Sequence, residues 1–139
     1  MARIVLTDAY CSINGVDLSD HIASVSISTT DDVIDTTGFS STSAAGRTRV
    51  AGLSDNSVTL EFHQDFATSS VEQTIYPLLG TATTLVVKPT SAVVSATNPS
   101  YTFSALVSEW QPLSGAVGEL ATASVTWPVS GAITKGVGV

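Results

Sequence analysis

The stretch from Ser57 to Gly80 constrains the fold most, because its hydrophobic period changes once, from that of a strand to that of a helix. Val58, Leu60 and Phe62 alternate with polar residues, and a period of two is typical of a half-buried β-strand. Successive side chains of a strand point to opposite faces, so the alternating polar residues are expected to share the face away from the core. These residues are Thr59, Glu61, His63 and Asp65.

The second part of this stretch has the period of a short amphipathic helix. Ser69 and Glu72 have the spacing of a capping box, in which the two side chains satisfy free backbone N–H groups at the helix start. Pro77 shortens the regular helix, and Gly80 is the residue type that commonly follows a helix end. The residues predicted to form its apolar face are Val71, Ile75, Leu78 and Leu79.

No other segment has a convincing helical period, so the rest of the chain is predicted to form strands and loops. Asn14-Gly15 is a strong signal for a tight turn, and Pro128 ends the last strand or marks a sheet edge. The chain is therefore expected to be mainly β and to form one domain over residues 1–139, with the helix on one face. Further strands are predicted at residues 4–13, 22–30, 83–89, 101–110 and 119–127.

Residues 31–56 show no sustained period of either kind. A structureless loop of this length is uncommon in a compact domain and is usually functional or disordered. Its acids come first and its bases last, which suits either a hairpin held by its own salt bridges or pairing between one subunit and the next. The charged residues at its two ends are Asp31, Asp32, Asp35, Arg47 and Arg49. The Gly-rich residues 130–139 are predicted to form a mobile tail.

The charge of the chain limits its partners. Charged residues make up only 12% of the sequence, about half the usual share, and the formal net charge is −7. A polar but weakly charged surface suits a protein that is packed against copies of itself, although drift in composition is the alternative explanation. The acidic balance argues against gripping nucleic acid, which requires basic patches.

Two further features bear on location. Cys11 is the single cysteine, whereas a secreted domain of this size usually carries paired cysteines. The apolar run Ile4–Leu6 is far too short for a signal peptide, and no segment approaches the length of a transmembrane helix. A cytosolic fold with a buried Cys11 is therefore favoured, and no membrane partner is expected.

No pattern in the sequence predicts catalysis. His21 and His63 are the only histidines, and neither has a partner at metal-ligand spacing in a recognisable motif. A weak metal or acid–base site on the face of Glu61, His63 and Asp65 is conceivable, but a solvated or interface-facing strand is favoured because such sites are rare. The aspartates of residues 31–35 lack the spaced oxygens and the glycine of an EF-hand loop. We therefore expect no enzymatic activity, no metal and no cofactor.

The order of these elements resembles that of the major tail proteins of long-tailed bacteriophages, the subunits of the tail tube. Three stretches carry the resemblance: the first turn with its flanks, Ile13–Asp20, the central strand with its approach, Gly52–Phe62, and the last strand, Leu120–Gly131. A long loop lies between the first two stretches, and the single helix follows the second. The resemblance covers most of the chain, from Ile13 to Gly131, and rests on strand-and-turn patterns.

This resemblance implies a β-sandwich or half-barrel with one flanking α-helix. Subunits of the family form six-membered rings whose sheets join into one barrel, and the rings stack into a tube through a long loop and the chain ends. Residues 31–56 match the position of that loop, so the candidates for inter-ring contact are Asp31, Asp32, Asp35, Phe39, Arg47 and Arg49. The candidates for the lumen or an inter-subunit strand face are Thr59, Glu61, His63 and Asp65.

The resemblance also implies partners and a location. The partners are copies of the chain itself, a tape-measure protein and other tail proteins, with DNA only in transit during ejection. The location is the virion tail, after synthesis in the cytoplasm of the bacterial host. Assembly agrees with the physics of an open sheet, because ring closure pairs edge N–H and C=O groups that are otherwise free.

Three alternatives stay open at the level of the sequence. The first is another virion β-protein, such as a tail-completion or capsid decoration protein. The second is a secreted β-sandwich binding module, which the single Cys11 disfavours. The third is an enzyme that uses the face of Glu61, His63 and Asp65.

Overall fold

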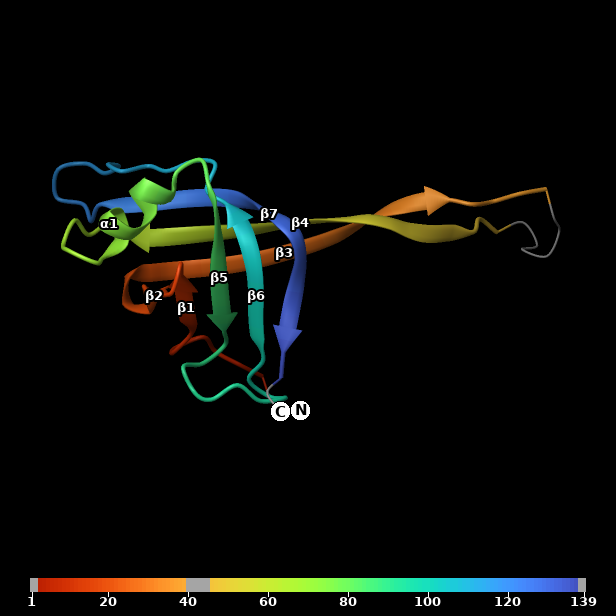
Figure 1. Cartoon of the computed structure of the whole chain (residues 1–139), viewed down its shortest axis with the longest axis horizontal. Helices are drawn as coiled ribbons and strands as arrows, with labels where there is room; N and C mark the ends of the chain where they lie inside the picture. Colours follow the sequence, from red (N-terminus) through yellow and green to blue (C-terminus); the bar gives the residue numbers. More distant parts are fainter. Residues whose placement is uncertain (1–2, 40–45, 138–139) are drawn as a thin grey trace.

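The computed structural model describes residues 3–39 and 46–137, and these residues are mainly β, as predicted (Figure 1). Within them, the strands form one antiparallel sheet in the order β2-β1-β5-β6-β7-β4-β3. The strands are β1 (Tyr10–Ile13), β2 (Val16–Asp17), β3 (Ile22–Asp35), β4 (Arg49–His63), β5 (Ala82–Lys88), β6 (Ser100–Leu106) and β7 (Thr122–Gly136). A short 3-10 turn, η1 (Ser19–His21), precedes β3.

Strand β7 joins the two halves of the sheet. Its residues Thr122–Pro128 pair with β4, whereas its residues 129–136 pair with β6. The change of partner occurs between Pro128 and Val129, and Gly131 follows with a φ of +88°, in the left-handed region that favours glycine. The register against β6 shifts at the same place, as expected for a bulge that bends a strand. As a result β3, β4 and the first half of β7 run along the molecule, while β1, β5, β6 and the second half of β7 run across it (Figure 1).

The core lies between these two halves, which form the body of the molecule. Val58, Leu60 and Phe62 of β4 are fully buried, which confirms the predicted strand face. The Trp127 indole is also fully buried, and its ring centroid lies 6.4 Å from that of Phe62. Burial of one large apolar side chain contributes about 1.5–3 kcal/mol, so these residues hold the two halves together. Further buried residues come from every part of the body: Ile13, Leu18, Ile75, Leu85, Phe103, Ala105 and Val125.

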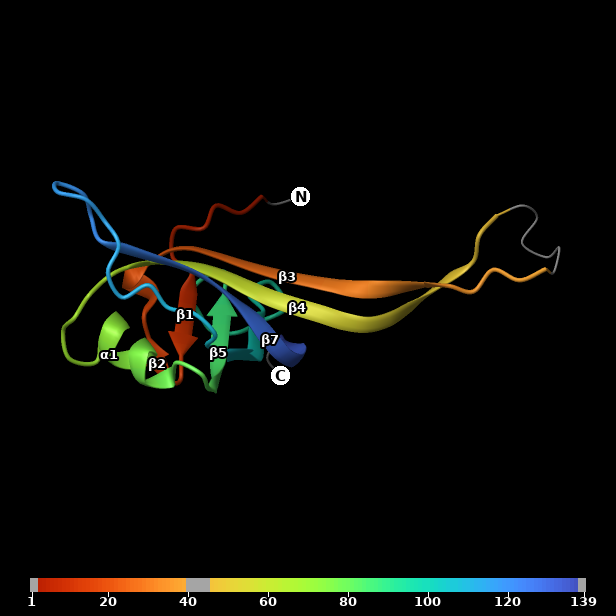
Figure 2. The same cartoon turned by 90° about the horizontal axis from the view of Figure 1, so that it is seen from above.

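A two-stranded arm leaves this body. It consists of the far ends of β3 and β4 with their connection, described here over residues 30–39 and 46–55, and it projects well beyond the rest of the molecule (Figure 2). The expectation of a structureless loop over residues 31–56 is therefore wrong, because β3 continues to Asp35 and β4 starts at Arg49.

The sequence hides the arm for two physical reasons. Both faces of the ribbon are exposed, so burial imposes no alternation of apolar and polar residues. The pairing also slips at a bulge between Asp31 and Val33, which breaks any remaining period of two.

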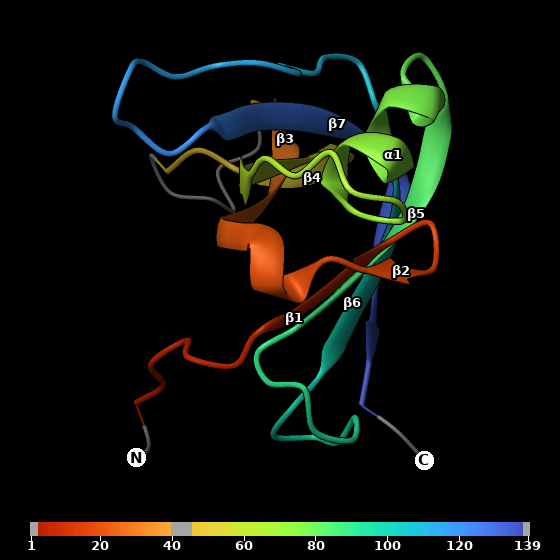
Figure 3. The same ribbon diagram turned by 90° about the vertical axis from the view of Figure 1, so that its left-hand side faces the viewer.

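The helix α1 (Val71–Ile75) and the 3-10 turn η3 (Tyr76–Leu78) lie at the end of the body opposite to the arm (Figure 1), and Figure 3 shows α1 from that end. The predicted capping box is wrong. Ser70 is the N-cap residue, and Ser69 has a φ of +61°. The Glu72 carboxylate instead accepts a hydrogen bond of 2.7 Å from the Trp110 indole N–H, so it is not free to turn back to the helix start.

The apolar face of the helix is shorter than predicted. Val71 and Ile75 are fully buried, but Leu79 is 45% exposed and does not belong to the buried face. Pro77 lies in the 3-10 turn, where the residues per turn differ from those of an α-helix, so the helical period no longer applies after Ile75. Gly80 follows with a φ of +85°, as expected for a stop.

Two predicted strand limits at the chain ends are also wrong. Residues 4–9 form no strand, because β5 offers a partner only as far as Lys88, opposite Tyr10, and Pro89 then lacks an N–H group. Residues 130–136, expected to belong to a mobile tail, continue β7 and pair with β6. Residues 138–139 of the predicted tail lie outside the described residues. Pro128 does not end the last strand but lies inside β7, opposite Ser57.

Candidate assembly interface

The exposed face of β3, β4 and β7 is lined by hydroxyl groups. The apolar residues of these strands point into the core, so alternation leaves the opposite face to serine and threonine. The hydroxyl oxygens of Thr59 and Thr126 lie 3.2 Å apart across the β4–β7 pair. The exposed residues of this hydroxyl face are Ser24, Ser26, Ser28, Thr59, Glu61, Ser124 and Thr126. All of these except Glu61 carry a hydroxyl group, so the face is polar but nearly uncharged.

The expectation of a shared strand face holds for His63 by alternation but is wrong for Asp65, because β4 ends at His63. The Asp65 carboxylate turns toward the start of α1 instead. It accepts hydrogen bonds from the Ala67 backbone N–H (2.9 Å) and the Ser70 hydroxyl (2.7 Å). One of its oxygens also lies 3.0 Å from His21 Nε2.

The surroundings of Asp65 explain its electrostatics. The Ala67 N–H is the largest cause that lowers the pKa of Asp65, followed by the Ser70 hydroxyl and by His21. At pH values above the ordinary titration range of aspartate, the ionised carboxylate therefore links the start of α1 to the turn η1. These contacts give Asp65 a structural role. Among the described residues, no three metal-ligating side chains lie close enough together to hold a metal ion.

The charges near the tip of the arm pair within the chain. Arg47 Nη1 lies 3.0 Å from Asp35 Oδ2, and Arg49 is the register partner of Asp35. The sequence allowed two arrangements of these charges, and this contact matches the hairpin that is held by its own salt bridge. The Thr37 hydroxyl and backbone N–H lower the pKa of Asp35 most, and Arg47 lowers it further. The pair is well exposed, so it contributes little to stability by itself.

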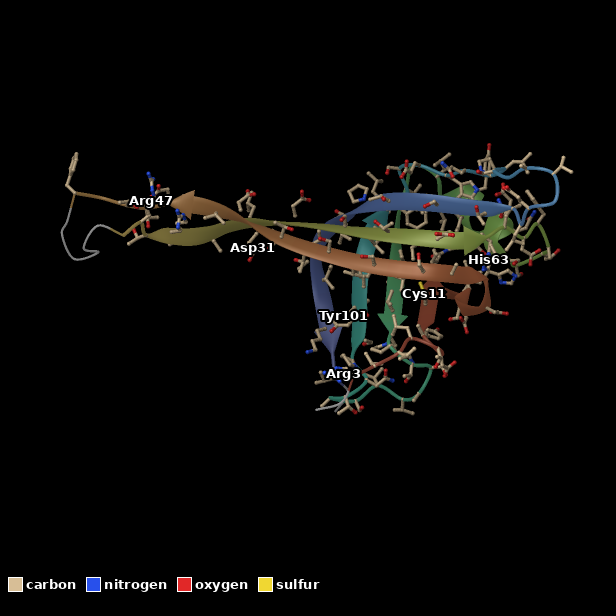
Figure 4. All side chains as sticks on the ribbon, turned by 180° about the vertical axis from the view of Figure 1, so that it is seen from behind. Arg3, Cys11, Asp31, Arg47, His63 and Tyr101 are labelled. Atoms are coloured by element: carbon tan, nitrogen blue, oxygen red, sulfur yellow. The ribbon has the colours of Figure 1, made fainter. Side chains whose placement is uncertain are left out.

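The aspartates nearer the base of the arm are arranged differently. The Asp31 carboxylate accepts a hydrogen bond of 2.5 Å from the Ser54 hydroxyl, and Asp32 lies at the bulge. Among the described residues, neither carboxylate has a cationic partner. Figure 4 shows Asp31 and Arg47 on the arm, with His63 at the other end of β4. The arm therefore presents acidic groups along its length and a neutralised pair near its tip.

The arm also exposes apolar side chains that the sequence analysis did not select. Ile34 and Val50 are register partners on one side of the ribbon, and Val33 lies on the other. All of these side chains are exposed, as are Phe39 and Leu53. The available signal was the β-branched character of residues 33–34 and 50, which favours strands even without alternation. A two-stranded ribbon with exposed apolar side chains is marginally stable alone, which makes the arm a candidate for contact with another surface.

Other features of the described residues offer no chemistry. A hollow of about 510 Å³ near the base of the arm is lined mainly by apolar and hydroxyl side chains, among them Ile27, Tyr101 and Ile133. Burial, and next the charge of Asp17, raises the pKa of the Cys11 thiol to about 12, so this thiol stays protonated. None of the helices in the described residues is long and apolar enough to cross a membrane.

Comparison with known proteins identifies the fold. No family model and no curated protein matches the sequence. A chain from the virion of the native gene transfer agent particle superposes with a TM-score of 0.75 at 12% identity, over 96% of this chain and 98% of that one. A chain of the SPP1 tail tube gives a TM-score of 0.73 at 13% identity, over 99% and 81% of the two chains. The chain has a tail-tube fold.

A third match fits the same fold. A chain from the tail of the empty gene transfer agent particle, a structure with C6 symmetry, gives a TM-score of 0.59 at 15% identity, over 82% and 81% of the chains. These tail-tube-like structures agree with the expected mainly β architecture with one flanking helix. The arm, the body and the helix all lie within the matched length, because the first two matches span nearly the whole chain.

Proposed function

We propose that this chain is a structural virion protein that assembles into stacked rings and forms the tail tube through which DNA is ejected. The observation that carries the proposal is the whole-length match to tail-tube structures, combined with an arm that has no core of its own. A subunit that worked alone would gain nothing from exposing such a ribbon. A subunit in a stack would bury it.

The hydroxyl face is our candidate for the lumen. Its exposed serines and threonines can hydrogen-bond water, and Glu61 adds a single negative charge. Such a lining repels phosphate weakly and offers no basic group that would hold DNA in place. Thr59, Glu61 and His63 therefore remain lumen candidates, whereas Asp65 is assigned to the support of α1.

The arm is our candidate for contact between rings. Asp31 and Asp32 carry negative charge without a cationic partner among the described residues, so they are available to a neighbouring subunit. Phe39, Ile34 and Val50 supply apolar surface near them. Asp35, Arg47 and Arg49 form the charged cluster near the tip, where each exposed pair is worth about 0.2–1 kcal/mol and repetition around a ring multiplies the effect.

The proposal assigns partners as well. The chain binds copies of itself in rings, with hexamers favoured by the C6 symmetry of one matched tail, and contacts a tape-measure protein and other tail proteins. DNA passes without specific binding, and the protein works in the virion tail after synthesis in the bacterial host. The proposed role is structural, without enzymatic activity.

Electron microscopy of the purified protein, with sedimentation over a wide concentration range, tests this proposal. Tubes built from stacked rings are the expected result. A strict monomer at high concentration and moderate salt would contradict the proposal. Single rings that never stack would favour the alternative of a tail-completion or decoration protein, and DNA binding at micromolar concentration would contradict the proposed lumen.

A further inference from the structure

One edge of the first half of β7 pairs with no other strand of the sheet, and a segment of the same chain covers it. Residues Thr122–Pro128 pair with β4 on one side, but β6 pairs only with the second half of β7. The other side of this first half would therefore present unpaired backbone groups. An exposed edge of this kind is a template for pairing with another chain.

Each backbone N–H group that would point outward from this edge either donates a hydrogen bond or is missing. The Thr126 N–H donates to the Glu109 carboxylate over 2.8 Å, and the Ser124 N–H donates to the Gln111 side-chain oxygen over 3.5 Å. The Thr122 N–H donates to the Ser114 carbonyl over 3.1 Å. The next position in the same alternation is Pro128, which has no N–H. The N–H groups of this edge are thus closed to a second strand.

The geometry of the covering segment shows that it is not an additional strand. Glu109 and Gln111 reach β7 with their side chains and Ser114 with one backbone carbonyl, whereas a paired strand uses its backbone at every second residue. Trp110 between them is anchored separately: its indole N–H donates to Glu72, and its ring lies edge-on to Phe62 at 5.5 Å. The two covering side chains can therefore turn away while the Trp110 anchor stays in place.

The opposite edge of the same half is open. The backbone N–H of Thr126 points away from β4, so the residues of β4 that form backbone hydrogen bonds to β7 are the two neighbours of Thr59. The backbone of Thr59 itself points the other way, toward its register partner Ser26 of β3. The alternation then turns the backbone groups of Val25, Ile27 and Thr29 outward. Among the described residues, no backbone hydrogen bond covers them. One half-sheet thus carries a covered edge and a bare one.

We propose that Glu109 and Gln111 are an edge guard, which blocks β7 in the free chain and yields to the bare β3 edge of a second copy during assembly. Head-to-tail pairing of two different edges is the contact that generates rings. The carbonyl groups of the incoming β3 would replace the two side chains as acceptors for Ser124 and Thr126. This inference rests on the proposed function for its partner, and the guard itself keeps free subunits from pairing prematurely.

Amide exchange in the free chain tests the guard without assembly. In a dilute sample of Glu109→Ala, followed by nuclear magnetic resonance, the Thr126 amide should exchange about tenfold faster, since one hydrogen bond to a charged acceptor is lost. Glu109→Gln keeps an acceptor and should exchange nearly as the wild type does. Unchanged exchange at Thr126 in Glu109→Ala would overturn the guard.

Assembly tests the exchange of partners. The critical concentration for tube formation, measured by light scattering and electron microscopy, should fall about tenfold in Glu109→Ala, because the competing acceptor is gone. Glu119→Ala removes the same charge from the same connection without touching β7, and it should behave as the wild type does. A higher or unchanged critical concentration in Glu109→Ala would overturn the proposal, because the side chain would then belong to the interface or be irrelevant to it.

The two measurements separate this inference from the proposed function. If the wild type forms tubes and Glu109→Ala does not lower the critical concentration, the guard alone is refuted. A wild-type chain that never associates refutes the proposed tube, and faster Thr126 exchange together with association of Glu109→Ala would still support a guarded edge.

Discussion

The two ends of β4 show how differently one strand can behave. From Ser57 to His63 it pairs with β3 on one side and β7 on the other, and its apolar residues are buried. From Arg49 to Asp55 it pairs with β3 alone, and its residues are exposed apart from the half-buried Gly52. Backbone pairing with β3 continues across the boundary, so what separates the ends is the second neighbour and the core.

The stability of the subunit resides mainly in the body. The body removes large apolar side chains from water, and this is the dominant favourable contribution to folding. The arm makes hydrogen bonds that largely replace hydrogen bonds to water, and each yields only about 0.5–1.5 kcal/mol net. The body is therefore expected to fold alone, while the arm gains most of its order from a partner.

The largest expected effect is the loss of stability when an aromatic residue of the body is replaced, compared with the same replacement in the arm. Trp127→Ala should destabilise the subunit by about 3–5 kcal/mol, because it leaves a cavity against Phe62 in the core. Phe39→Ala on the exposed arm should change the free energy of unfolding by less than about 0.5 kcal/mol. Denaturant unfolding measures both values. Equal decreases in the free energy of unfolding would show that the arm is part of the core.

The next effect lies at the end of the body that holds α1. Asp65→Asn should lower the melting temperature at neutral pH, because the contacts with Ala67, Ser70 and His21 favour the carboxylate. A lowered pKa means that this contribution is complete above the unfolded-state pKa of about 4 and disappears as the pH falls through the folded-state pKa. The wild type should therefore lose stability on acidification more steeply than the variant.

The control for Asp65 is a carboxylate on the arm. Asp55→Asn removes the same charge where no hydrogen bond or ion pair is found among the described residues, so its melting temperature should match that of the wild type. An Asp65→Asn variant with an unchanged melting curve from neutral to acidic pH would show that the Asp65 contacts do not support the body.

A smaller effect on folding should accompany a large effect on assembly. Replacing Ile34 and Val50 together by serine removes a cross-strand apolar pair of the arm, and each exposed substitution should cost about 0.5 kcal/mol or less. Tube formation should nevertheless fail, because the proposed contact surface between rings loses its apolar part. Circular dichroism and electron microscopy on the same sample give the two readings. Tubes of wild-type length from this variant would remove the arm from the stacking interface.

The smallest expected effect on the subunit comes from its exposed charges. Arg47→Glu breaks the pair with Asp35, yet the subunit should melt within about 0.5 kcal/mol of the wild type, because exposed ion pairs contribute little. Repeated around each ring, the same change should shorten tubes, and added salt should shorten wild-type tubes in the same direction. Wild-type tubes that lengthen steadily with salt would show that apolar contact governs stacking.

Parts of the candidate interface were readable from the sequence, and others were not. The hydroxyl face follows from alternation around Val58, Leu60 and Phe62, and the charges of the arm were visible as acids followed by bases. Phe39 and Arg47 were selected, but Ile34 and Val50 were missed, because exposure on both sides of the ribbon leaves no pattern to detect. The guard residues Glu109 and Gln111 were also missed, since their meaning depends on contacts with β7 that are distant along the chain.

Local sequence patterns were sufficient to predict the mainly β class, the turn at Asn14-Gly15, the buried face of β4 and the position of the helix. These features depend on local periods and on residues with special backbone preferences, and such signals survive without a neighbour. The tertiary structure was needed to show that the far ends of β3 and β4 form an arm, that Asp65 supports α1, and that β7 changes partner between Pro128 and Val129. Those outcomes depend on which strand lies beside which, and burial and edge pairing are properties of the assembled sheet.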